Sequence, residues 1–460
     1  MKILTALPPY LLSWFMGFMI TQYVFRQAQR PAWPVRLFLA GGLGAGISAG
    51  LQFMSFWLLD GRHNALTVMA HLLLGTLLAY LLWQYKPRRQ HKIRRTETNW
   101  KQAAASLVFI LACLPLWFQS QYYPLGGWDA WQVWNFKARF LFLAGNHWKN
   151  LFHPVLWRSS PHYPLLLPLF NVWAWSFFNH PAVLVPQLTA LFFTVLTMAL
   201  LSTVLWESVQ KPWVMLGPIL LLTLPFYGLL AISQYSDIAL SFYFLAGFFC
   251  LCETLRAEKR SGPSRQPPGR LTYAALGGIF WGMAGFTKPE GLVAAGIACL
   301  MTGILWLTSD YPKAVKIKLF LSLALALGII SIPSIVFHLK YSPGNLTFVN
   351  GLASTQQPVT LYRLKMILAF LLTELKSSKW NGLWFLLGFG IILGGRRCWR
   401  RDQVILPAFL LLYLTAVLGY CWINTYFPIG WWLQVSLNRI LFSLLPIMVF
   451  WVFGAIGQEK

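Results

Sequence analysis

The chain alternates between long apolar runs and shorter polar or basic segments. A helix of roughly 20 apolar residues crosses the ~30 Å hydrocarbon layer of a bilayer, and about thirteen of the runs are long enough. We predict spanning helices near residues 3–25, 35–59, 65–85, 103–119, 182–206, 213–232, 238–255, 271–287, 291–308, 319–338, 380–395, 403–423 and 440–456. The first run lacks a small-residue cleavage site, so we expect a helix there rather than a removed signal. The pattern predicts an all-α polytopic membrane protein.

Composition agrees with this prediction and sets an orientation. The chain is 57% hydrophobic and 11% charged, which is too little polar surface for a soluble domain. Its net charge of +25 comes largely from short basic segments between apolar runs, chiefly Lys86–Lys101, Arg256–Arg270 and Arg396–Arg401. Basic loops of this kind stay in the cytoplasm, so we expect an inner-membrane protein with its N-terminus outside. We expect no nucleic-acid partner.

The same topology divides the chain into two parts. Residues 1–102 hold three helices and the strongest basic loop, and they carry little polar chemistry. Residues 103–456 form the predicted core. Its outer segments 120–181 and 339–379 are too long to be simple turns, and amphipathic stretches in both predict helices lying along the membrane surface.

Three acidic residues lie where apolar helices meet the outer face. They are Asp129 in GGWDAW, Asp237 in QYSDIAL and Glu290 in TKPEGL. Each also has a structural explanation, because Asp129 and Asp237 are suitable helix N-caps and Glu290 can pair with Lys288. Three acids at neighbouring helix mouths nevertheless indicate a site, since charge is expensive near a membrane.

Basic and aromatic residues lie on the same side against the general charge bias. The candidates for substrate binding are Lys137, Arg139, His162, Tyr163, Lys288, Glu290 and Arg439. Arg439 either extends to the membrane interface or binds a phosphate through its forked donors. The spacing of the histidines is not that of a zinc site. We predict no cofactor, and a divalent metal is left open.

In order and topology these motifs resemble the membrane glycosyltransferases of the GT-C fold, of the protein O-mannosyltransferase and lipid A aminoarabinose transferase type (family-39-like). Those enzymes have an acid on a first-loop juxtamembrane helix, then an HPP-like stretch, a second acid, a Lys-Pro turn and a late Arg. The matching positions are Asp129, His162-Tyr163-Pro164, Asp237, Lys288-Pro289 and Arg439. The resemblance covers about residues 103–456. WDAW replaces the paired acidic motif and HYP replaces HPP, which leaves the acceptor open.

The resemblance implies a GT-C-like core that moves a sugar from a polyprenyl phosphate or diphosphate to a lipid, glycan or protein acceptor. The reaction would occur on the extracytoplasmic face, with Asp129 and Asp237 as the catalytic acids. Asp129 would be the general base, while Lys288 and Arg439 would meet the phosphate. We expect inversion, because no second nucleophile is apparent. The alternative is a transporter or flippase of lipid-linked sugar. It would need charged or broken helices near the midplane and internal symmetry, and the sequence shows neither, since the acids lie at helix ends.

Overall fold

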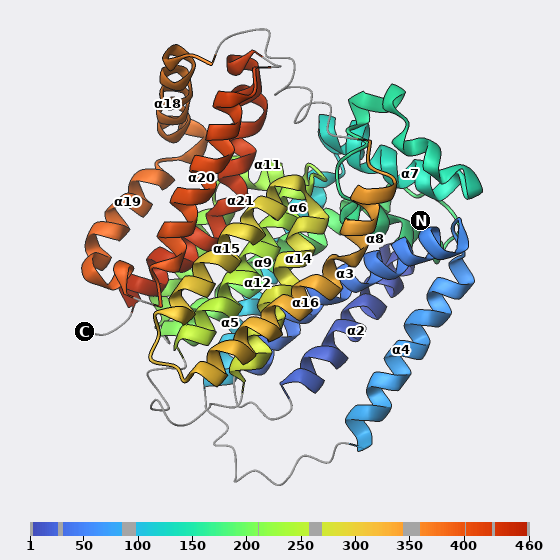
Figure 1. The fold of residues 1–460 in the computed structure, drawn as a ribbon, viewed down its shortest axis with the longest axis horizontal. Helices are drawn as coiled ribbons and strands as arrows, with labels where there is room; N and C mark the ends of the chain where they lie inside the picture. Colours follow the sequence, from blue (N-terminus) through green and yellow to red (C-terminus); the bar gives the residue numbers. More distant parts are fainter. Residues whose placement is uncertain are drawn as a thin grey trace.

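The computed structural model describes residues 3–25, 31–84, 98–209, 211–256, 269–343, 359–400, 402–425 and 428–457, with backbone alone for 98–102. Throughout these ranges the regular structure is helical and contains no strand, as the apolar pattern predicts (Figure 1). Most residues of the basic segments 86–101 and 256–270 lie outside the described residues. In the predicted outer segment 339–379, residues 344–358 also lie outside them.

Within the described ranges, nine helices are long and apolar enough to cross a membrane, which indicates a multi-pass membrane protein. Residues 103–120 form one of them across the short break between α5 (Thr98–Ala112) and α6 (Leu114–Ser120). The others are α3 (Trp33–Leu59), α4 (Asn64–Gln84), α9 (Leu184–Val209), α12 (Ser236–Arg256), α15 (Pro289–Leu307), α16 (Lys313–Lys340), α20 (Ile405–Ile423) and α21 (Ile429–Gly457).

The predicted count of thirteen spans is not confirmed. Four of the predicted segments hold helices outside the nine: α2 (Pro8–Val24), α14 (Arg270–Thr287), α19 (Leu383–Gly394) and a broken pair. That pair is α10 (Leu216–Leu222) and α11 (Pro225–Ile232), which meet at an angle of 68° where a single straight span was predicted. Leu224 is extended because the ring of Pro225 disfavours helical geometry in the residue before it.

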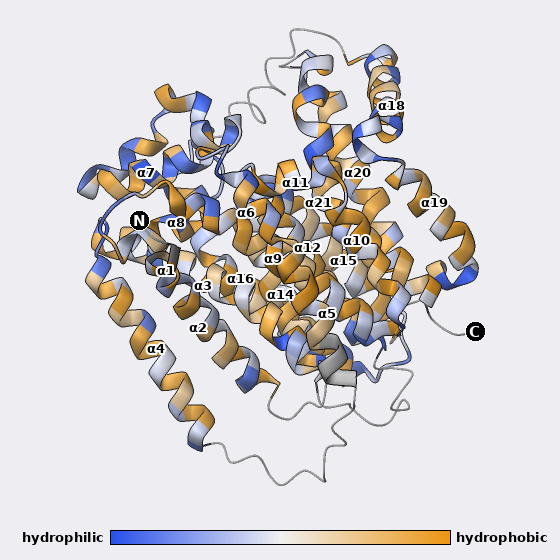
Figure 2. Cartoon of the chain, turned by 180° about the vertical axis from the view of Figure 1, so that it is seen from behind, coloured by the Kyte–Doolittle hydropathy of each residue, from blue (hydrophilic) through white to orange (hydrophobic). Residues whose placement is uncertain are grey.

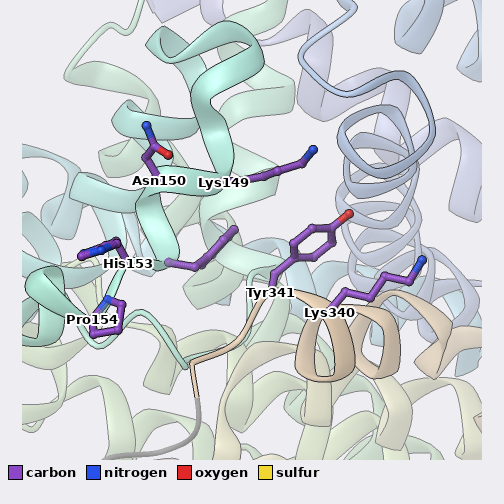
Figure 3. Close-up of a pocket in the computed structure, with 7 residues that line it drawn as sticks. Lys149, Asn150, His153, Pro154, Lys340 and Tyr341 are labelled. Carbon is purple, nitrogen blue, oxygen red and sulfur yellow. The ribbon is translucent and has the colours of Figure 1, made fainter.

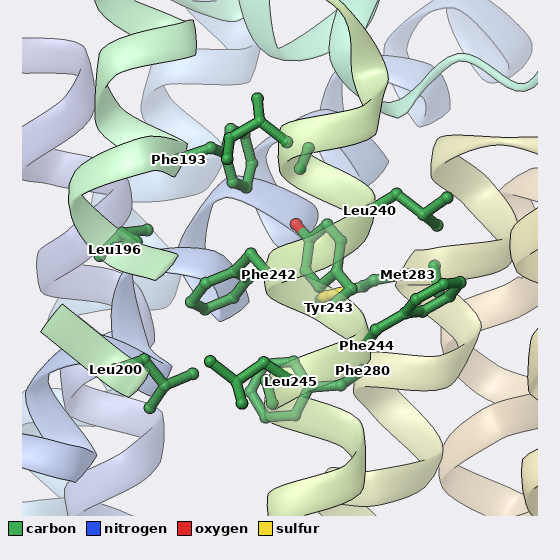
Figure 4. Packing of buried hydrophobic residues seen from close by; sticks show 14 of the residues in the cluster. Phe193, Leu196, Leu200, Leu240, Phe242, Tyr243, Phe244, Leu245, Phe280 and Met283 are labelled. Atoms are coloured by element: carbon green, nitrogen blue, oxygen red, sulfur yellow. The ribbon is translucent and has the colours of Figure 1, made fainter. Parts of the chain in front are cut away.

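Helix α12 lies at the centre of the bundle, and almost its whole length is buried. It packs against α9, α14 and α21, and α14 packs in turn against α16. Aromatic rings fill the layer between these helices, among them Phe193, Phe242 and Phe280 (Figure 4). Rigid packing around α12 fixes the position of its first turn, where Asp237 lies.

The N-terminal helices are in direct contact with this bundle. At the crossing of α2 and α3 a Cβ on Gly44 would lie 1.7 Å from the carbonyl oxygen of Ser13, so the two backbones touch. Small residues permit such close approach between membrane helices. Trp173 of α8 (Leu166–Ser176) donates from Nε1 to Ser13 Oγ at 2.9 Å, which ties α2 to the predicted core.

Two groups of shorter helices extend from one end of the bundle (Figure 1), where polar residues are frequent among the otherwise apolar helices (Figure 2). The first comprises η1 (Ala130–Trp134), α7 (Asn135–Leu143), η2 (Gly145–Phe152) and η3 (Pro154–Ser159), with α7 packed against the buried helix α8. The second is α18 (Leu361–Lys376) and η5 (Ser378–Trp380) beside α20 and α21. The remaining short helices are α1 (Ile3–Ala6), η4 (Pro212–Met215) and η6 (Gly395–Trp399).

Helix α18 is attached to α20 by one buried arginine. The Arg363 guanidinium donates to the backbone carbonyls of Cys421, Trp422 and Asn424 at the end of α20. The last carbonyls of a helix have no partner within it, so this side chain satisfies them. The helices α18, α20 and the start of α21 therefore form a connected wall at the end of the bundle that carries Asp237.

Candidate active site

Five of the sequence-predicted residues meet in one ion network, hereafter the Asp129–Glu290 network. Arg439 donates from Nε and Nη2 to Asp237 Oδ2 at 3.0 and 2.8 Å, and from Nη1 to Asp129 Oδ2 at 2.5 Å. Lys288 Nζ lies 3.0 Å from Asp237 Oδ1 and 3.1 Å from Glu290 Oε1. The contacts run in the order Asp129, Arg439, Asp237, Lys288, Glu290, so the predicted convergence of acids and cations is present.

Helix starts position the middle of this network. Asp237 is in the first turn of α12 and Glu290 in the first turn of α15, where unpaired backbone N–H groups favour negative charge. Lys288 precedes α15 in an extended conformation, and Pro289 begins the helix. The predicted pairing of Lys288 with Glu290 is confirmed, and Asp237 is a second partner of the same ammonium group.

Arg439 lies deeper in its helix than the sequence predicts. We predict a last span from residue 440, whereas α21 begins at Ile429, ten positions before Arg439. The polar side chains Gln434 and Asn438 end the apolar run without ending the helix. The guanidinium is held by two carboxylates and lies 4.4 Å from the ring centroid of Tyr235, so its donors are used within the protein.

Asp129 stands at the N-cap position of η1 but makes no capping bond with its side chain. Its carboxylate binds Arg439 instead, so the capping role that the sequence suggests is not found. η1 is a π-helix, and its extra residue per turn changes which side chains face inward. Trp134 is buried, whereas Trp131, three positions earlier, is 44% exposed.

The loop that carries Asp129 is fixed to the segment before α12. Gly127 N donates to Ser233 O at 3.0 Å, and Gln234 Nε2 donates to Pro124 O at 3.1 Å. Gly126 has φ +72°, and a Cβ there would lie 2.5 Å from the Ser233 carbonyl oxygen, so only glycine fits without strain. These contacts place Asp129 beside the first turn of α12 across more than 100 positions of sequence.

Three residues that help to hold Asp129 and Arg439 in place were not predicted from the sequence. Asn135 donates to Gln234 Oε1 at 2.7 Å, and Tyr235 lies under the Arg439 guanidinium. An uncharged amide or a tyrosine near a helix start is too common to be singled out by type. Only their positions could have indicated a role. Gln234 and Tyr235 lie just before Asp237, and Asn135 lies one helical turn after Trp131.

Accessibility differs between the ends of the network and its middle. The side chains of Asp129 and Glu290 are 28% and 25% exposed, whereas that of Asp237 is 2% exposed. Burial works against the charge of Lys288, but Asp237 and Glu290 outweigh it, so the pKa of Lys288 is raised. Three carboxylates facing two cations leave an excess of negative charge when all five are ionised.

Several polar atoms on residues of this network, or on residues next to them in sequence, make no hydrogen bond to another group of the protein. They are Ser236 Oγ, Glu290 Oε2 and Asn438 Oδ1, and each is shielded from solvent. Buried polar atoms normally have partners, and unpaired ones are costly. A ligand rich in hydroxyl groups would offer matching donors and acceptors.

Lys137 is placed differently from its predicted role in substrate binding. Its side chain is fully buried, and Nζ donates to the carbonyl oxygens of Ser160 and Tyr163 at 2.5 and 3.2 Å. Burial lowers the pKa of this amine well below its usual value. Both hydrogen bonds of Lys137 therefore go to the segment that carries His162 and Tyr163, and neither goes to the Asp129–Glu290 network.

The other candidates from segment 120–181 lie at different distances from the network. Burial raises the pKa of Tyr163, with a further contribution from Glu290, so its hydroxyl lies within electrostatic reach of the network. His162 packs edge-on against Tyr163 at 4.8 Å between ring centroids, and burial together with Lys137 lowers its pKa to about 3. Arg139 is exposed, and within the described ranges it forms no ion pair with these residues.

In the part of the chain that the structure describes, no group of three or more His, Cys, Asp or Glu residues has a metal-binding arrangement. The network pairs its acids with Lys288 and Arg439 rather than with one another. No protein-family model, curated protein or solved structure matches this chain.

Proposed function

We propose that the protein is an integral-membrane glycosyltransferase of the GT-C type, which transfers a sugar from a polyprenyl phosphate carrier to an acceptor hydroxyl outside the cytoplasm. The observation that carries the proposal is the Asp129–Glu290 network, in which an accessible carboxylate lies beside two fixed cations. Glycosyl transfer needs a base for the acceptor and positive charge for the leaving phosphate. The diphosphate form of the carrier fits the same requirement.

Asp237 acts as a positioning residue in this proposal. Both of its oxygens are occupied, Oδ1 by Lys288 and Oδ2 by Arg439, and the carboxylate is almost inaccessible. It therefore holds the two cations at a fixed separation instead of exchanging a proton with a substrate. The sequence predicts Asp237 as a second catalytic acid, and we propose instead that it holds Lys288 and Arg439 in place before the reaction. Electrostatic catalysis depends on charges that are fixed in advance in this way.

Donor binding would change the partners of Arg439. Its Nε and Nη2 are committed to the buried Asp237, whereas Nη1 holds the partly exposed Asp129. A donor phosphate competes for Nη1 most easily, because that contact is the more accessible one. Exchange at this atom frees the Asp129 oxygen that Arg439 had bound, so donor binding makes both oxygens of the carboxylate available to an acceptor.

The proposed step is an inverting displacement. The acceptor oxygen forms a bond to the anomeric carbon while the bond from that carbon to the phosphate oxygen breaks. The acceptor proton passes to Asp129, and the phosphate leaves with the electron pair, stabilised by Lys288 and Arg439. The unpaired Ser236 Oγ, Glu290 Oε2 and Asn438 Oδ1 are suited to bind sugar hydroxyls during this step.

The test measures what happens to the polyprenyl phosphate carrier. Purified protein in liposomes receives a polyprenyl phosphate sugar with and without candidate acceptors, and free polyprenyl phosphate is measured. We expect acceptor-dependent release, with the sugar recovered on the acceptor in inverted configuration. No release with any acceptor class, from protein that is folded and inserted, would overturn the proposal.

The alternative, a transporter or flippase of lipid-linked sugar, is favoured by one observation. Helices α10 and α11 meet at 68°, and broken helices of this kind line substrate pathways in transporters. The two functions differ in what happens to the carrier. A flippase moves labelled donor between leaflets and leaves its sugar attached, so labelled donor recovered intact on the opposite leaflet would favour this second function.

A further inference from the structure

A pocket lies outside the Asp129–Glu290 network. A cavity of about 620 Å³ opens between η2 and the end of α16 (Figure 3). It is lined by Lys149, Asn150, Phe152, His153, Pro154, Lys340 and Tyr341. None of these seven residues is acidic, and the volume is within the range of small-molecule sites. Its lining has the chemistry of an anion site.

The cavity is built on a rigid aromatic floor. Phe152 packs edge-on against Phe337 at 5.3 Å between ring centroids, and Trp148 packs against Tyr341 at 4.8 Å. These contacts join η2 to α16, so the two walls keep their separation. Phe152 and Tyr341 also line the cavity, where an aromatic surface suits the apolar face of a sugar ring.

The polar groups gather around that floor. The side chains of Lys149, Tyr341 and Lys340 extend toward the same side of the cavity, and His153 lies opposite (Figure 3). His153 Nδ1 accepts from Val155 N at 3.2 Å, so in the neutral ring Nε2 carries the proton and can donate. The two ammonium groups and the tyrosine hydroxyl supply donors on one side of the cavity for a phosphate or carboxylate, and His153 offers a separate donor on the other side.

One acid competes for this charge. Asp60 ends α3 in the left-handed conformation, with φ 52°, and its Oδ1 lies 2.7 Å from Lys149 Nζ. Trp148 Nε1 donates to the same oxygen at 3.1 Å. Lys340 has no acidic partner among the described residues, and its Nζ lies 5.4 Å from the ring centroid of Trp57. The cavity thus keeps a net positive charge.

We infer that this cavity binds an anionic saccharide, with a phosphate or carboxylate between Lys149 and Lys340 and the sugar ring against Phe152 and Tyr341. The further step, that the bound saccharide is the acceptor of sugar transfer, rests on the proposed function. The binding of the saccharide to the cavity does not. The saccharide is either a soluble molecule or the headgroup of a lipid, since both present the same chemistry.

The experiment is a binding titration of the detergent-purified full chain without donor. The probes are a monosaccharide phosphate, the same sugar without phosphate, inorganic phosphate, and a phosphorylated glycolipid in micelles. We expect the sugar phosphate to bind at least about tenfold more tightly than either fragment. A preference between the soluble and the micellar probe identifies the source of the ligand.

Variants separate the cavity from general surface charge. Lys149→Gln and Lys340→Gln should each weaken binding about tenfold or more. Asp60→Asn should tighten it severalfold, because it releases Lys149 while keeping an oxygen for Trp148 and a residue that tolerates the left-handed conformation. Lys379→Gln is the matched control, since Lys379 pairs with Glu374 at 2.7 Å outside the cavity. A merely structural role for Asp60 would not produce tighter binding.

Unchanged affinity in Lys149→Gln and Lys340→Gln would overturn the inference, as would equal affinity for inorganic phosphate and the sugar phosphate. Carrier release is measured on the same preparations. Binding with no release from any donor would support the cavity and count against the proposed function. Release to an uncharged acceptor with no binding of the sugar phosphate would do the reverse.

Discussion

Arg439 and Asp129 form an ion pair across 310 positions of sequence. Arg439 lies within α21, and Asp129 lies in the segment between α6 and η1. The same guanidinium binds Asp237 in the first turn of α12, so one side chain joins three distant segments. Arg439 faces one buried partner and one accessible partner, and this difference leads to separate expectations for the two acids.

Replacing Asp129 with Asn should reduce sugar transfer by about two to four orders of magnitude, the usual contribution of a general base. The amide oxygen can still accept from Arg439, so folding should be retained. Polyprenyl phosphate release and thermal unfolding are measured together. Glu374→Gln is the control, because Glu374 is an ion-paired acid outside the network. Full activity in Asp129→Asn contradicts the assignment.

Replacing Asp237 with Ala should destabilise the protein far more than replacing Asp129 with Ala. Loss of Asp237 leaves Lys288 and Arg439 without their shared partner in a buried position, which costs about 3–5 kcal/mol. Loss of Asp129 costs less, because Asp129 is partly exposed and Arg439 keeps its buried partner Asp237. Thermal unfolding in detergent compares the two variants. Equal shifts would show that burial does not distinguish them.

Gly126→Ala should lower both stability and activity, because the new Cβ would lie 2.5 Å from the Ser233 carbonyl oxygen and push the Asp129 loop away. Gly145→Ala is a matched control in the same segment. Gly145 also has positive φ, +56°, but no atom lies within 4 Å of its Cβ position. The control should show only the backbone strain of about 1 kcal/mol. Similar activity in the two variants would argue against the loop contact.

Stability should fall as the pH is lowered through the range between 6.5 and about 3, because the pKa of His162 is about 3 in the folded chain and near 6.5 when unfolded. In that window the unfolded chain binds a proton that the folded chain does not, so unfolding gains as the pH falls. His162→Gln should flatten this dependence, by at most about 1.4 kcal/mol per pH unit.

The comparison is the thermal midpoint measured from about pH 7 to pH 4. His147→Gln, which changes an exposed histidine of the same segment, is the control. A pH dependence that is identical in all three proteins would mean that His162 does not titrate in this range.

The sequence located the acids and cations of the network because helix alternation places Asp129, Asp237, Lys288 and Arg439 at the same end of the bundle. Their pairing could not be read in the same way. Whether Arg439 binds Asp129, Asp237 or both depends on the depth of Arg439 in α21, and polar residues obscured where that helix begins. For Lys137 the sequence predicts a role in substrate binding, but the structure buries this lysine against backbone carbonyl groups.

The cavity residues gave no sequence signal at all. Lys149 and Lys340 are about 190 positions apart, and each looks like an ordinary basic residue near a helix end. Aromatic contacts, Phe152 with Phe337 and Trp148 with Tyr341, bring their segments together in the folded chain. The bend between α10 and α11 was signalled by Pro225, but the length of the apolar run outweighed it.

The depth of Arg439 has a consequence for the choice of acceptor. Arg439 lies ten positions after Ile429, about 15 Å along the helix axis, and α18 and α20 flank the start of α21. If transfer occurs there, a hydroxyl on a bulky soluble polymer needs a slender arm of about that length to arrive from above. A hydroxyl on a lipid can arrive sideways between helices. The protein would then select acceptors first by whether their hydroxyl group can come close to Arg439, and only then by the chemical groups around that hydroxyl.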